Sequence, residues 1–461
     1  MMSSWYLYAM LIYLFFFNTK ITIETFFPLF QTNLFEAFEF YISTFPFLFS
    51  CGILFFLFIL WKYITCSFRP LGKKAMYSFG LLGVLLLLVL ILGNVKRHIL
   101  LFSIYEESKK LCSMIPHGYT VQREESLKAF TTQEKKGAHL YVLVIGESAT
   151  RQGLGAYGYY RDTTPFLSST LGKENTLLMD SVYTSATYTE QAVFSMLTNH
   201  TGYDDEQRRV SVLDIARSAG VKTIWITNQS MLDATNPQVS AIAEQADIVI
   251  SDRGGLVSYA QYDEYLLPHI EHILNTEVNE ENILIVIHLY GSHINFCRRF
   301  DKNKYSIFTD IPSNIQHTKY NEVNCYDNSI YATDDVLRRI VALVEEKSTF
   351  QFLLYVSDHG EGVYRGVGRG HPESVQDVLR VPFYIYMSDV YREANEKRVE
   401  ILHSHSNRGY TTDMLFDTLL GLMDIKSTAY RSQYDISSTS YAYEYDTLKH
   451  SGSVYIKDSM K

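Results

Sequence analysis

The stretch LYVLVIGE, residues 140–147, consists of six apolar residues followed by a glycine and a carboxylate. A near-continuous apolar run of this length is typical of a strand that is buried on both faces of a parallel sheet. Strands of this kind carry their functional polar residues just past the carboxyl end, where ligands bind in open α/β sheets. The stretch therefore predicts an α/β fold with Glu147 at a functional edge.

Similar short runs recur along the chain, and we expect the strands of the sheet at 140–145, 178–182, 222–226, 248–250, 283–288, 352–356 and 381–386. Helical patterns lie between them, at 210–219, 259–274 and 326–344, with a last helix from Thr411. Strands that alternate with helices favour parallel pairing. The expected architecture is a doubly wound, mainly parallel sheet with helices on both faces.

The first hundred residues differ from the rest, because three stretches there lack charged side chains: 1–19, 40–61 and 75–95. A helix needs roughly 20 apolar residues to cross a bilayer, so we expect about three transmembrane helices. The first stretch also fits the core of a signal peptide, but no small-residue cleavage site follows it. We expect a membrane domain at 1–100, a connector at 101–137 and a catalytic domain at 138–461.

Basic residues predict the orientation of these helices, since they are enriched in cytoplasmic loops. The loop between the second and third stretches contains Lys62, Arg69, Lys73 and Lys74. The loop after the first stretch is mainly acidic, with Glu24, Glu36 and Glu39. The third helix then runs outward, so that in a Gram-negative cell the protein is a multi-pass inner-membrane protein whose catalytic domain lies in the periplasm.

The charge of the chain argues against one class of partner. The 461 residues carry a formal net charge of −9, and 47% of them are hydrophobic. Nucleic-acid binding normally needs a basic face, so we expect no nucleic acid among the partners.

Only two of the five cysteines, Cys297 and Cys325, fall within the expected catalytic domain. In an oxidising compartment such a pair indicates a disulfide. Two unpaired, buried thiols are the alternative.

Two predicted strands end in residues that bind metal ions. Glu147 follows the first strand, and Asp358 and His359 follow the strand in QFLLYVSDHGEG, residues 351–362. Two carboxylates and one imidazole at one edge of a sheet make a site for a divalent ion. Taken singly, Glu147 also fits a helix N-terminus and Asp358–His359 an ordinary turn. Both follow buried strands, which favours the metal site.

Three more histidines lie near this edge. His288 ends a predicted strand and is expected to be structural, whereas His293 and His371 lie in the loops of HLYGSH and GVGRGHPES. Contact with a phosphate, proton transfer and binding of a second metal ion are all open for the two loop histidines, as is a solvated position without function.

A nucleophile is expected in the segment YTSATYTEQAVFSML, residues 183–197, which precedes and begins a helix. A hydroxyl at a helix N-terminus beside a metal ion can attack phosphorus. Threonine also commonly caps helices, and spacing alone does not separate the four candidates Thr184, Ser185, Thr187 and Thr189.

The run VLVIGESATRQGLGAYGYYRDTTPFL, residues 142–167, closely resembles the phosphoethanolamine transferases of Gram-negative envelopes, which belong to the alkaline phosphatase/sulfatase superfamily. Further similar motifs follow in the family's order: AGVKTIWITNQS (219–230), HLYGSH (288–293), YDNSIYATDDVL (326–337), VSDHGE (356–361) and LFDTLLGLMDI (415–425). The resemblance covers residues 138–426, and some members of the family confer polymyxin resistance.

The resemblance implies a role for each matched residue. Glu147, Asp358, His359 and Thr189 would bind one zinc ion, and Thr189 would be the nucleophile. His293 and His371 would bind the donor phosphate or a second zinc ion, and His293 could also protonate the leaving group. Asn228 would bind substrate, and Cys297 would pair with Cys325. The reaction would move phosphoethanolamine from phosphatidylethanolamine to lipopolysaccharide or another surface glycan through a phosphothreonine intermediate.

The sequence departs from the lipid A-directed members in two ways. Those members carry cysteines around the nucleophile where this chain has Ser185 and Ser195, and they have five membrane spans where three are expected here. Both differences favour a core sugar or another surface glycan over lipid A as the acceptor.

Three other functions deserve comparison. A formylglycine sulfatase needs the pattern C/S-x-P-x-R, which TEQAV lacks. A glycerophosphate transferase of the lipoteichoic acid synthase type is the alternative enzyme, with phosphatidylglycerol as donor and manganese as its usual metal. A catalytically silent binding protein on this fold is disfavoured, because Glu147, Thr189, Asp358 and His359 are all present.

Overall fold

The computed structural model describes residues 130–131, 138–201, 210–229, 237–251, 262–278, 281–311, 320–364, 375–450 and 454–456. The chain divides into two compact units, Met1–Gly118 and Tyr119–Lys461, and every described residue belongs to the second. Within the described part, no helix has both the length and the apolar character needed to span a bilayer. The three expected transmembrane helices and His371 lie outside the described residues.

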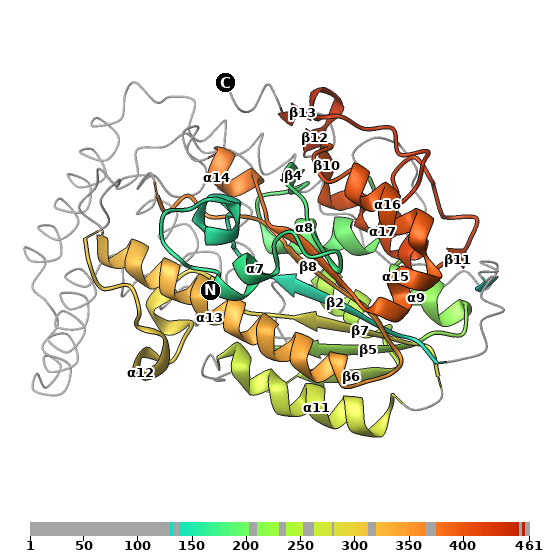
Figure 1. Cartoon of the computed structure of the whole chain (residues 1–461), viewed down its shortest axis with the longest axis horizontal. Coiled ribbons are helices and arrows are strands. Elements are labelled where there is room, and N and C mark those ends of the chain that lie inside the picture. The colour runs from blue at the N-terminus through green and yellow to red at the C-terminus, as the bar shows by residue number, and fades with distance from the viewer. Residues whose placement is uncertain are drawn as a thin grey trace, which may run out of the picture. The chain divides into compact units, whose positions relative to one another are not determined.

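A seven-stranded sheet forms the centre of the described unit (Figure 1). Its strands, in spatial order, are β3 (Thr176–Leu178), β9 (Phe383–Met387), β8 (Phe350–Ser357), β2 (Leu140–Gly146), β7 (Ile283–His288), β5 (Lys222–Thr227) and β6 (Ile248–Ser251). Strand β9 pairs antiparallel with both β3 and β8, and all other pairs in this sheet are parallel. The mainly parallel α/β architecture predicted from the sequence is confirmed. All seven residues of β2 are buried, because helices cover both faces of the sheet.

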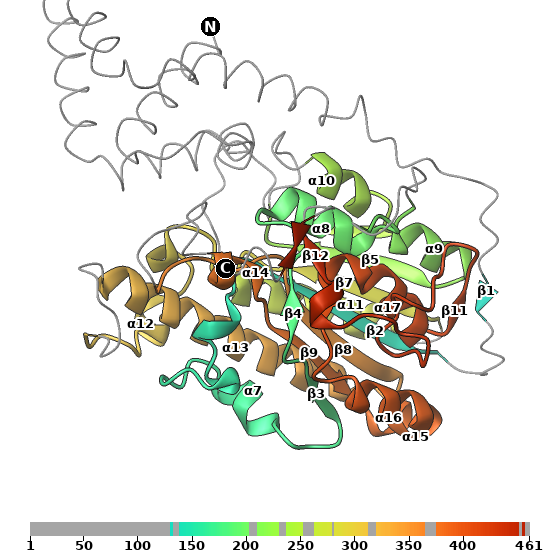
Figure 2. The ribbon, with the colours of Figure 1, turned by 90° about the horizontal axis from the view of Figure 1, so that it is seen from above.

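Two layers of helices produce this burial. One face of the sheet packs against α8 (Thr189–Leu197), α9 (Val212–Ser218), α10 (Pro237–Ala243), α15 (Asp389–Ala394), α16 (Glu396–Ser404) and α17 (Leu415–Leu422). The other face packs against α7 (Pro165–Thr170), α11 (Leu267–Thr276) and α13 (Tyr320–Glu345). The short helices α12 (Lys302–Tyr305) and α14 (Val375–Leu379) complete the described α-helices. The second view separates α8, α9 and α10 from α7 and α13 (Figure 2).

Three short pairings lie outside the central sheet. Strand β1 (Phe130–Thr131) pairs with β11 (Ile425–Lys426), β4 (Val182–Tyr183) with β10 (Tyr410–Thr411), and β12 (Lys449–His450) with β13 (Val454–Tyr455). The predicted strand at 178–182 was therefore wrong, since β3 ends at Leu178 and β4 begins at Val182. The chain leaves the sheet between them, where Asp180 N–H donates to the carbonyl oxygen of Ser406.

Two helices begin later than predicted. The helix expected at 259–274 starts with the 3₁₀ turn η4 (Asp263–Leu266), and the α-helix α11 begins only at Leu267. Pro268 explains this start, because proline lacks the N–H that a helix interior needs and is tolerated in the first turn. Near the carboxyl end, Thr411 belongs to β10, and the 3₁₀ turn η7 (Thr412–Met414) precedes α17.

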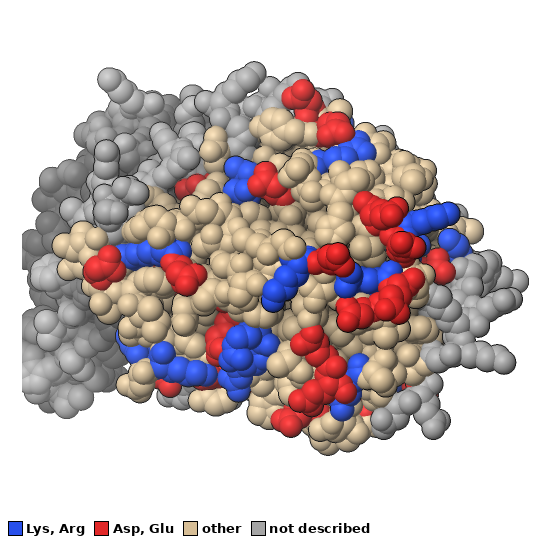
Figure 3. Space-filling view, in the orientation of Figure 1, with Lys and Arg blue, Asp and Glu red and all other residues tan. Residues whose placement is uncertain are grey.

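Charged side chains are dispersed over the surface. On the face drawn in Figure 3, Lys and Arg of the described residues alternate with Asp and Glu and form no broad basic field. That distribution agrees with the net charge of −9.

Candidate active site

The parallel pairing of β2 with β8 places the predicted acidic residues side by side. Gly146 of β2 is in register with Ser357 of β8, so the chain continues from both strands into Glu147 and Asp358 at the same edge. Ligand atoms of Glu147, Asp358 and His359 all lie within 4.8 Å of one another. His359 Nε2 is 3.3 Å from Asp358 Oδ2 and 3.4 Å from Glu147 Oε1. We call this group the acidic–imidazole cluster.

Hydrogen bonds orient the cluster inward. Asp358 Oδ1 accepts from the backbone N–H groups of Ser148 and His359, at 3.0 and 2.7 Å, which directs Oδ2 towards the imidazole. His359 Nδ1 lies 2.9 Å from the carbonyl oxygen of Gly360, so we assign the ring proton to Nδ1. Nε2 then presents a lone pair on the side of the two carboxylates, as in histidines that bind metal ions.

The cluster fits a divalent cation. Glu147, Asp358 and His359 are at most 1% exposed, and Asp358 Oδ2 accepts no hydrogen bond from the described residues. Burial raises the pKa of Asp358, and the N–H of Ser148 only partly offsets that effect. Two buried carboxylates beside a neutral imidazole are costly to ionise without a compensating positive charge. Oxygen and nitrogen donors in this ratio suit zinc.

Thr189 begins α8 and brings a hydroxyl to the same place. Its Oγ1 donates to Glu147 Oε2 at 2.9 Å and lies 3.4 Å from His359 Nε2. Of the other candidates, Thr184 is buried and donates to the carbonyl oxygens of Ala186 and Asp358, and Ser185 is 6% exposed. Thr189 is therefore the candidate whose hydroxyl touches the acidic–imidazole cluster, and it is only partly buried, which leaves it accessible from outside.

The loop after β7 packs directly on Glu147. Ser292 N–H donates to the carbonyl oxygen of Glu147 at 2.9 Å. His293 follows, and its ring stacks on Tyr290 with centroids 4.9 Å apart. This loop therefore places His293 at the same edge of the sheet as the cluster. His371, in the loop after β8, lies outside the described residues.

Asn228 is held inside the protein. It is 1% exposed, and its Nδ2 donates to Asp263 Oδ1 at 2.8 Å. The next residue, Gln229, reaches the site instead, with Nε2 3.4 Å from Glu147 Oε2 and 3.0 Å from the carbonyl oxygen of Leu289. Neither Gln229 nor Asp263 was predicted from the sequence as a site residue. Gln229 directly follows the end of β5, where side chains of parallel strands converge, and that position was the available signal.

His288 is buried in the core beside Trp225, with ring centroids 5.9 Å apart. Burial lowers the pKa of His288 to about 3, so the ring is neutral at ordinary pH. The structural role expected for this residue agrees with its position.

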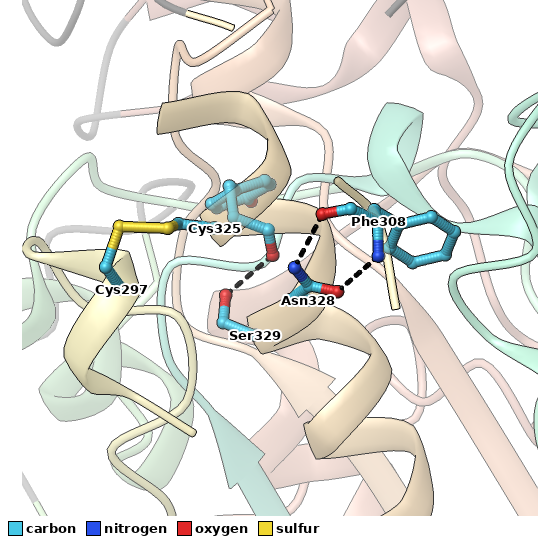
Figure 4. Close-up of a disulfide and its surroundings, with 6 residues drawn as sticks. Cys297, Phe308, Cys325, Asn328 and Ser329 are labelled. Atoms are coloured by element: carbon cyan, nitrogen blue, oxygen red, sulfur yellow. Dashed lines mark hydrogen bonds between the residues drawn. A yellow bond between two sulfur atoms is a disulfide. The ribbon is translucent and has the colours of Figure 1, made fainter. Parts of the chain in front are cut away.

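Helix α13 supports the site from the other face of the sheet. Cys297 and Cys325 form a disulfide that ties the start of this helix to the turn η5 (Phe296–Arg298) (Figure 4). The next residue, Tyr326, donates its hydroxyl to the carbonyl oxygen of Ser148 at 2.7 Å and accepts from the N–H of Thr150 at 2.8 Å. The disulfide therefore lies one residue from the contact that holds the loop after Glu147.

The fold and this site define a class. A mainly parallel α/β sheet with a buried metal-binding cluster at its carboxyl edge, and a helix-initial hydroxyl in contact with it, is the arrangement of an alkaline phosphatase/sulfatase-type enzyme that attacks phosphate or sulfate esters. The chain belongs to the Sulfatase family, whose model matches residues 139–425. The segment TEQAV lacks the proline and arginine of the formylglycine motif.

Several curated relatives of this chain are named as transferases. The chain is 30% identical over 268 residues to phosphoethanolamine transferase EptC of Escherichia coli strain K12. The aligned region covers 56% of this chain and 46% of that protein. The chain thus spans about half the length of the curated relative that it matches. The resemblance to phosphoethanolamine transferases predicted from the motifs is confirmed.

Two solved structures share the fold. The C-terminal periplasmic domain of EptC from Escherichia coli, in complex with Zn, superposes with a TM-score of 0.62 at 24% identity, over 71% of this chain and 93% of that chain. The integral membrane protein lipooligosaccharide phosphoethanolamine transferase A from Neisseria meningitidis superposes with a TM-score of 0.68 at 22% identity. The superposition covers 92% of this chain and 83% of that chain. At these identities the likeness shows the fold alone.

Proposed function

We propose that this chain transfers phosphoethanolamine from phosphatidylethanolamine to lipopolysaccharide or another surface glycan. The names of its relatives support this reaction class, and one of their structures was solved with zinc. The observation that carries the proposal is the 2.9 Å contact between the Thr189 hydroxyl and Glu147 within the buried cluster. A lipid donor also explains the charge-free stretches at 1–19, 40–61 and 75–95, which we propose to be inner-membrane helices with the catalytic domain in the periplasm.

The proposed zinc site consists of Glu147, Asp358, His359 and the Oγ1 of Thr189. A bound zinc ion would lower the pKa of a neighbouring hydroxyl and offset the negative charge of a phosphodiester. Within the protein, Glu147 Oε2 holds the Thr189 hydroxyl by the hydrogen bond already formed, and α8 presents that hydroxyl from its first turn. The partial positive charge of the helix N-terminus adds to the stabilisation of an anionic oxygen.

In the first half-reaction, Thr189 Oγ1 attacks the phosphorus of phosphatidylethanolamine. A new Oγ1–P bond forms, and the bond from phosphorus to the glycerol oxygen breaks. Diacylglycerol leaves with a proton, for which His293 is the proposed donor, while the proton of Thr189 departs along its hydrogen bond to Glu147. Phosphoethanolamine remains on Thr189. His293 and His371 are the proposed ligands of the donor phosphate or of a second metal ion. The substrate-binding role predicted for Asn228 does not fit its position, because Asn228 is 1% exposed and its Nδ2 donates to Asp263.

In the second half-reaction, an acceptor hydroxyl passes its proton to His293 and attacks the same phosphorus. The Oγ1–P bond breaks, and the proton taken up by Glu147 returns to Oγ1. Thr189 is thereby regenerated, which makes the reaction a double displacement through a covalent intermediate. Ser185 and Ser195 favour a core sugar or another surface glycan as acceptor over lipid A. Both serines are buried.

The labelling of the full-length protein tests this function. The protein is reconstituted in vesicles of phosphatidylethanolamine, and peptide 183–197 is examined by mass spectrometry for added phosphoethanolamine. We expect the label on Thr189, its loss in Thr189→Ala, and its retention in Thr187→Ala. Label that survives in Thr189→Ala but disappears in Thr187→Ala would overturn the assignment of the nucleophile. Vesicles of phosphatidylglycerol serve as the donor control, and label from that lipid would favour a glycerophosphate transferase.

A further inference from the structure

The side chain of Asp263 gathers three hydrogen-bond donors beside the active site. It lies at the start of η4 and is 7% exposed. Its Oδ1 accepts from Asn228 Nδ2 and from the N–H of Tyr290, and its Oδ2 accepts from the N–H of Gly291, each at 2.8 Å. One carboxylate therefore joins the end of β5 to the turn that follows β7.

That turn lies against the backbone of Glu147. Gly291 has a φ of 45°, and a Cβ built there would lie 2.8 Å from the carbonyl oxygen of Glu147, 2.9 Å from its nitrogen and 3.1 Å from its Cβ. Ser292 N–H donates to the same carbonyl oxygen at 2.9 Å. The turn therefore fits Glu147 without a gap, and any shift of residues 290–292 moves the surface on which Glu147 rests.

From these contacts we infer that Asp263 is a positioning residue, which sets Glu147 within the metal site and His293 at its rim. None of these three hydrogen bonds is with a residue of the acidic–imidazole cluster. Asp263 acts through two backbone N–H groups of the turn, and Asn228 also donates to it from the end of β5. The inference rests on the proposed function for its effect on turnover, but its effect on the geometry of Glu147 is independent of any reaction.

Asp263→Asn is the sharpest probe, because it keeps the size of the side chain and replaces one acceptor oxygen with a donor NH₂ group. If the amide oxygen replaces Oδ1, the amide nitrogen faces the N–H of Gly291. If the amide is rotated, its nitrogen faces both Asn228 Nδ2 and the N–H of Tyr290. Either orientation sets a donor against a donor, so the turn must shift.

A matched control exists in α13. Asp334 is 2% exposed and likewise accepts from two backbone N–H groups, those of Phe166 and Leu167, at 2.7 and 3.1 Å. Those groups belong to the start of α7 and not to the turn that packs on Glu147. Asp334→Asn therefore reports the cost of the same chemical change where Glu147 is not involved.

The experiment compares Asp263→Asn and Asp334→Asn in the full-length protein in nanodiscs that contain phosphatidylethanolamine. Zinc affinity is measured by competition with a chromophoric chelator. We expect Asp263→Asn to raise the zinc dissociation constant by about 10- to 100-fold, as the loss of supporting contacts does at metal sites. Turnover should fall by about 10²-fold with little change in KM, because the reacting groups are misplaced. Asp334→Asn should leave zinc affinity and turnover close to wild type.

Hydrogen exchange of the metal-free protein supplies a readout that needs neither zinc nor activity. In Asp263→Asn, exchange should accelerate at the amides of 290 and 291 and also at Ser292, whose N–H bonds to Glu147. Acceleration confined to 290 and 291 would overturn the inference, because the turn would then loosen without disturbing Glu147. Equal zinc affinities in Asp263→Asn and Asp334→Asn would overturn it as well.

Gly291→Ala approaches the same contact from the other side, and it keeps the inference testable should Asp263→Asn fail to fold. Its new Cβ would collide with the backbone of Glu147. It should weaken zinc binding as Asp263→Asn does, and wild-type zinc affinity in this variant would contradict the inference.

If the wild-type protein transfers no phosphoethanolamine but Asp263→Asn still weakens zinc binding, the inference stands and the proposed function fails. If the wild-type protein transfers phosphoethanolamine but Asp263→Asn and Asp334→Asn bind zinc equally well, the proposed function stands and the inference about Asp263 fails.

Discussion

The hydroxyl oxygen of Thr189 lies 2.9 Å from Oε2 of Glu147, although 42 positions separate the two residues in the chain. Glu147 directly follows the central strand β2, and Thr189 begins α8 on one face of the sheet. The contact therefore depends on the packing of α8 against the sheet, and it joins the proposed nucleophile to the proposed metal ligands. Predictions about this site and its supports follow from that geometry.

Replacement of Glu147 by Gln should remove the metal without unfolding the protein. The amide keeps the size of the side chain but removes one of the two carboxylates that offset the charge of a divalent cation. We expect wild-type protein to retain about one zinc ion per chain after dialysis, and Glu147→Gln to retain little, as measured by elemental analysis. Glu361→Gln is a suitable control, since Glu361 is a buried carboxylate on the same loop as His359 but outside the cluster. Full zinc occupancy in Glu147→Gln would contradict the assignment.

Chelation should destabilise the wild-type protein more than the Glu147→Gln variant. A ligand that binds only the folded state adds about 2.7 kcal/mol of stability at a concentration of 100 times its dissociation constant. EDTA should therefore lower the Tm of the wild-type protein and leave the Tm of Glu147→Gln nearly unchanged. Identical shifts in both proteins, measured by differential scanning fluorimetry, would place the stabilising metal elsewhere.

Removal of the disulfide should weaken the start of α13. Cys297 and Cys325 are 28 residues apart, and closing a loop of that length lowers the free energy of the folded state relative to the unfolded one by about 3–4 kcal/mol in the chain-entropy model. Cys297→Ser with Cys325→Ser should lose about that free energy of unfolding, measured with urea. Dithiothreitol should destabilise the wild-type protein but not the double variant, and destabilisation of both would point to another cause.

The hydroxyl of Tyr326 should matter separately from its ring. Tyr326→Phe removes the hydrogen bonds to Ser148 and Thr150 and leaves the N–H of Thr150 in a buried place without that partner. The cost of such a group is about 1–3 kcal/mol of unfolding free energy. Tyr391→Phe is the matched control, because the buried Tyr391 hydroxyl donates to the carbonyl oxygen of Leu422, away from the cluster. Zinc affinity should fall in Tyr326→Phe only, and equal affinities would show that this hydroxyl does not support Glu147.

Asp334 should make the stability of the domain depend on pH. Burial raises its pKa to about 7 in the folded state, partly opposed by the N–H groups of Phe166 and Leu167. The folded state therefore favours the protonated acid, so its contribution is intact at low pH and is lost as pH rises from about 4 to 7. The full loss is about 4 kcal/mol at most. Urea unfolding of wild type and Asp334→Asn at several pH values should show a stability difference that shrinks or reverses over this window, and a constant difference would contradict the shift.

The sequence predicted the central sheet because its strands are buried on both faces. The runs at 140–145, 222–226 and 283–288 fall within β2, β5 and β7. The edge strand β3 was misplaced, because an edge strand has fewer neighbours and a weaker apolar pattern. Its run merged with the residues of β4, which pair with β10 and not with the sheet. The pattern of one strand does not reveal its partner.

Local pattern and motif resemblance were sufficient to predict the residues of the candidate site. Glu147, Asp358 and His359 stand directly after buried strands, and parallel strands end at a common edge, so their convergence follows from the strand pattern alone. Thr189 could not be separated from Thr184, Ser185 and Thr187 by spacing, because the choice depends on how α8 packs on the sheet.

Only the tertiary structure revealed the hydrogen bond between Asn228 and Asp263. The same is true of the contacts that Gln229 makes with Glu147 and that Tyr326 makes with Ser148. These contacts join residues far apart in the chain through single side-chain hydrogen bonds. Such bonds produce no repeating pattern in a sequence, because each depends on one polar atom at one position. A buried strand or helix, in contrast, repeats apolar residues along the face that it buries.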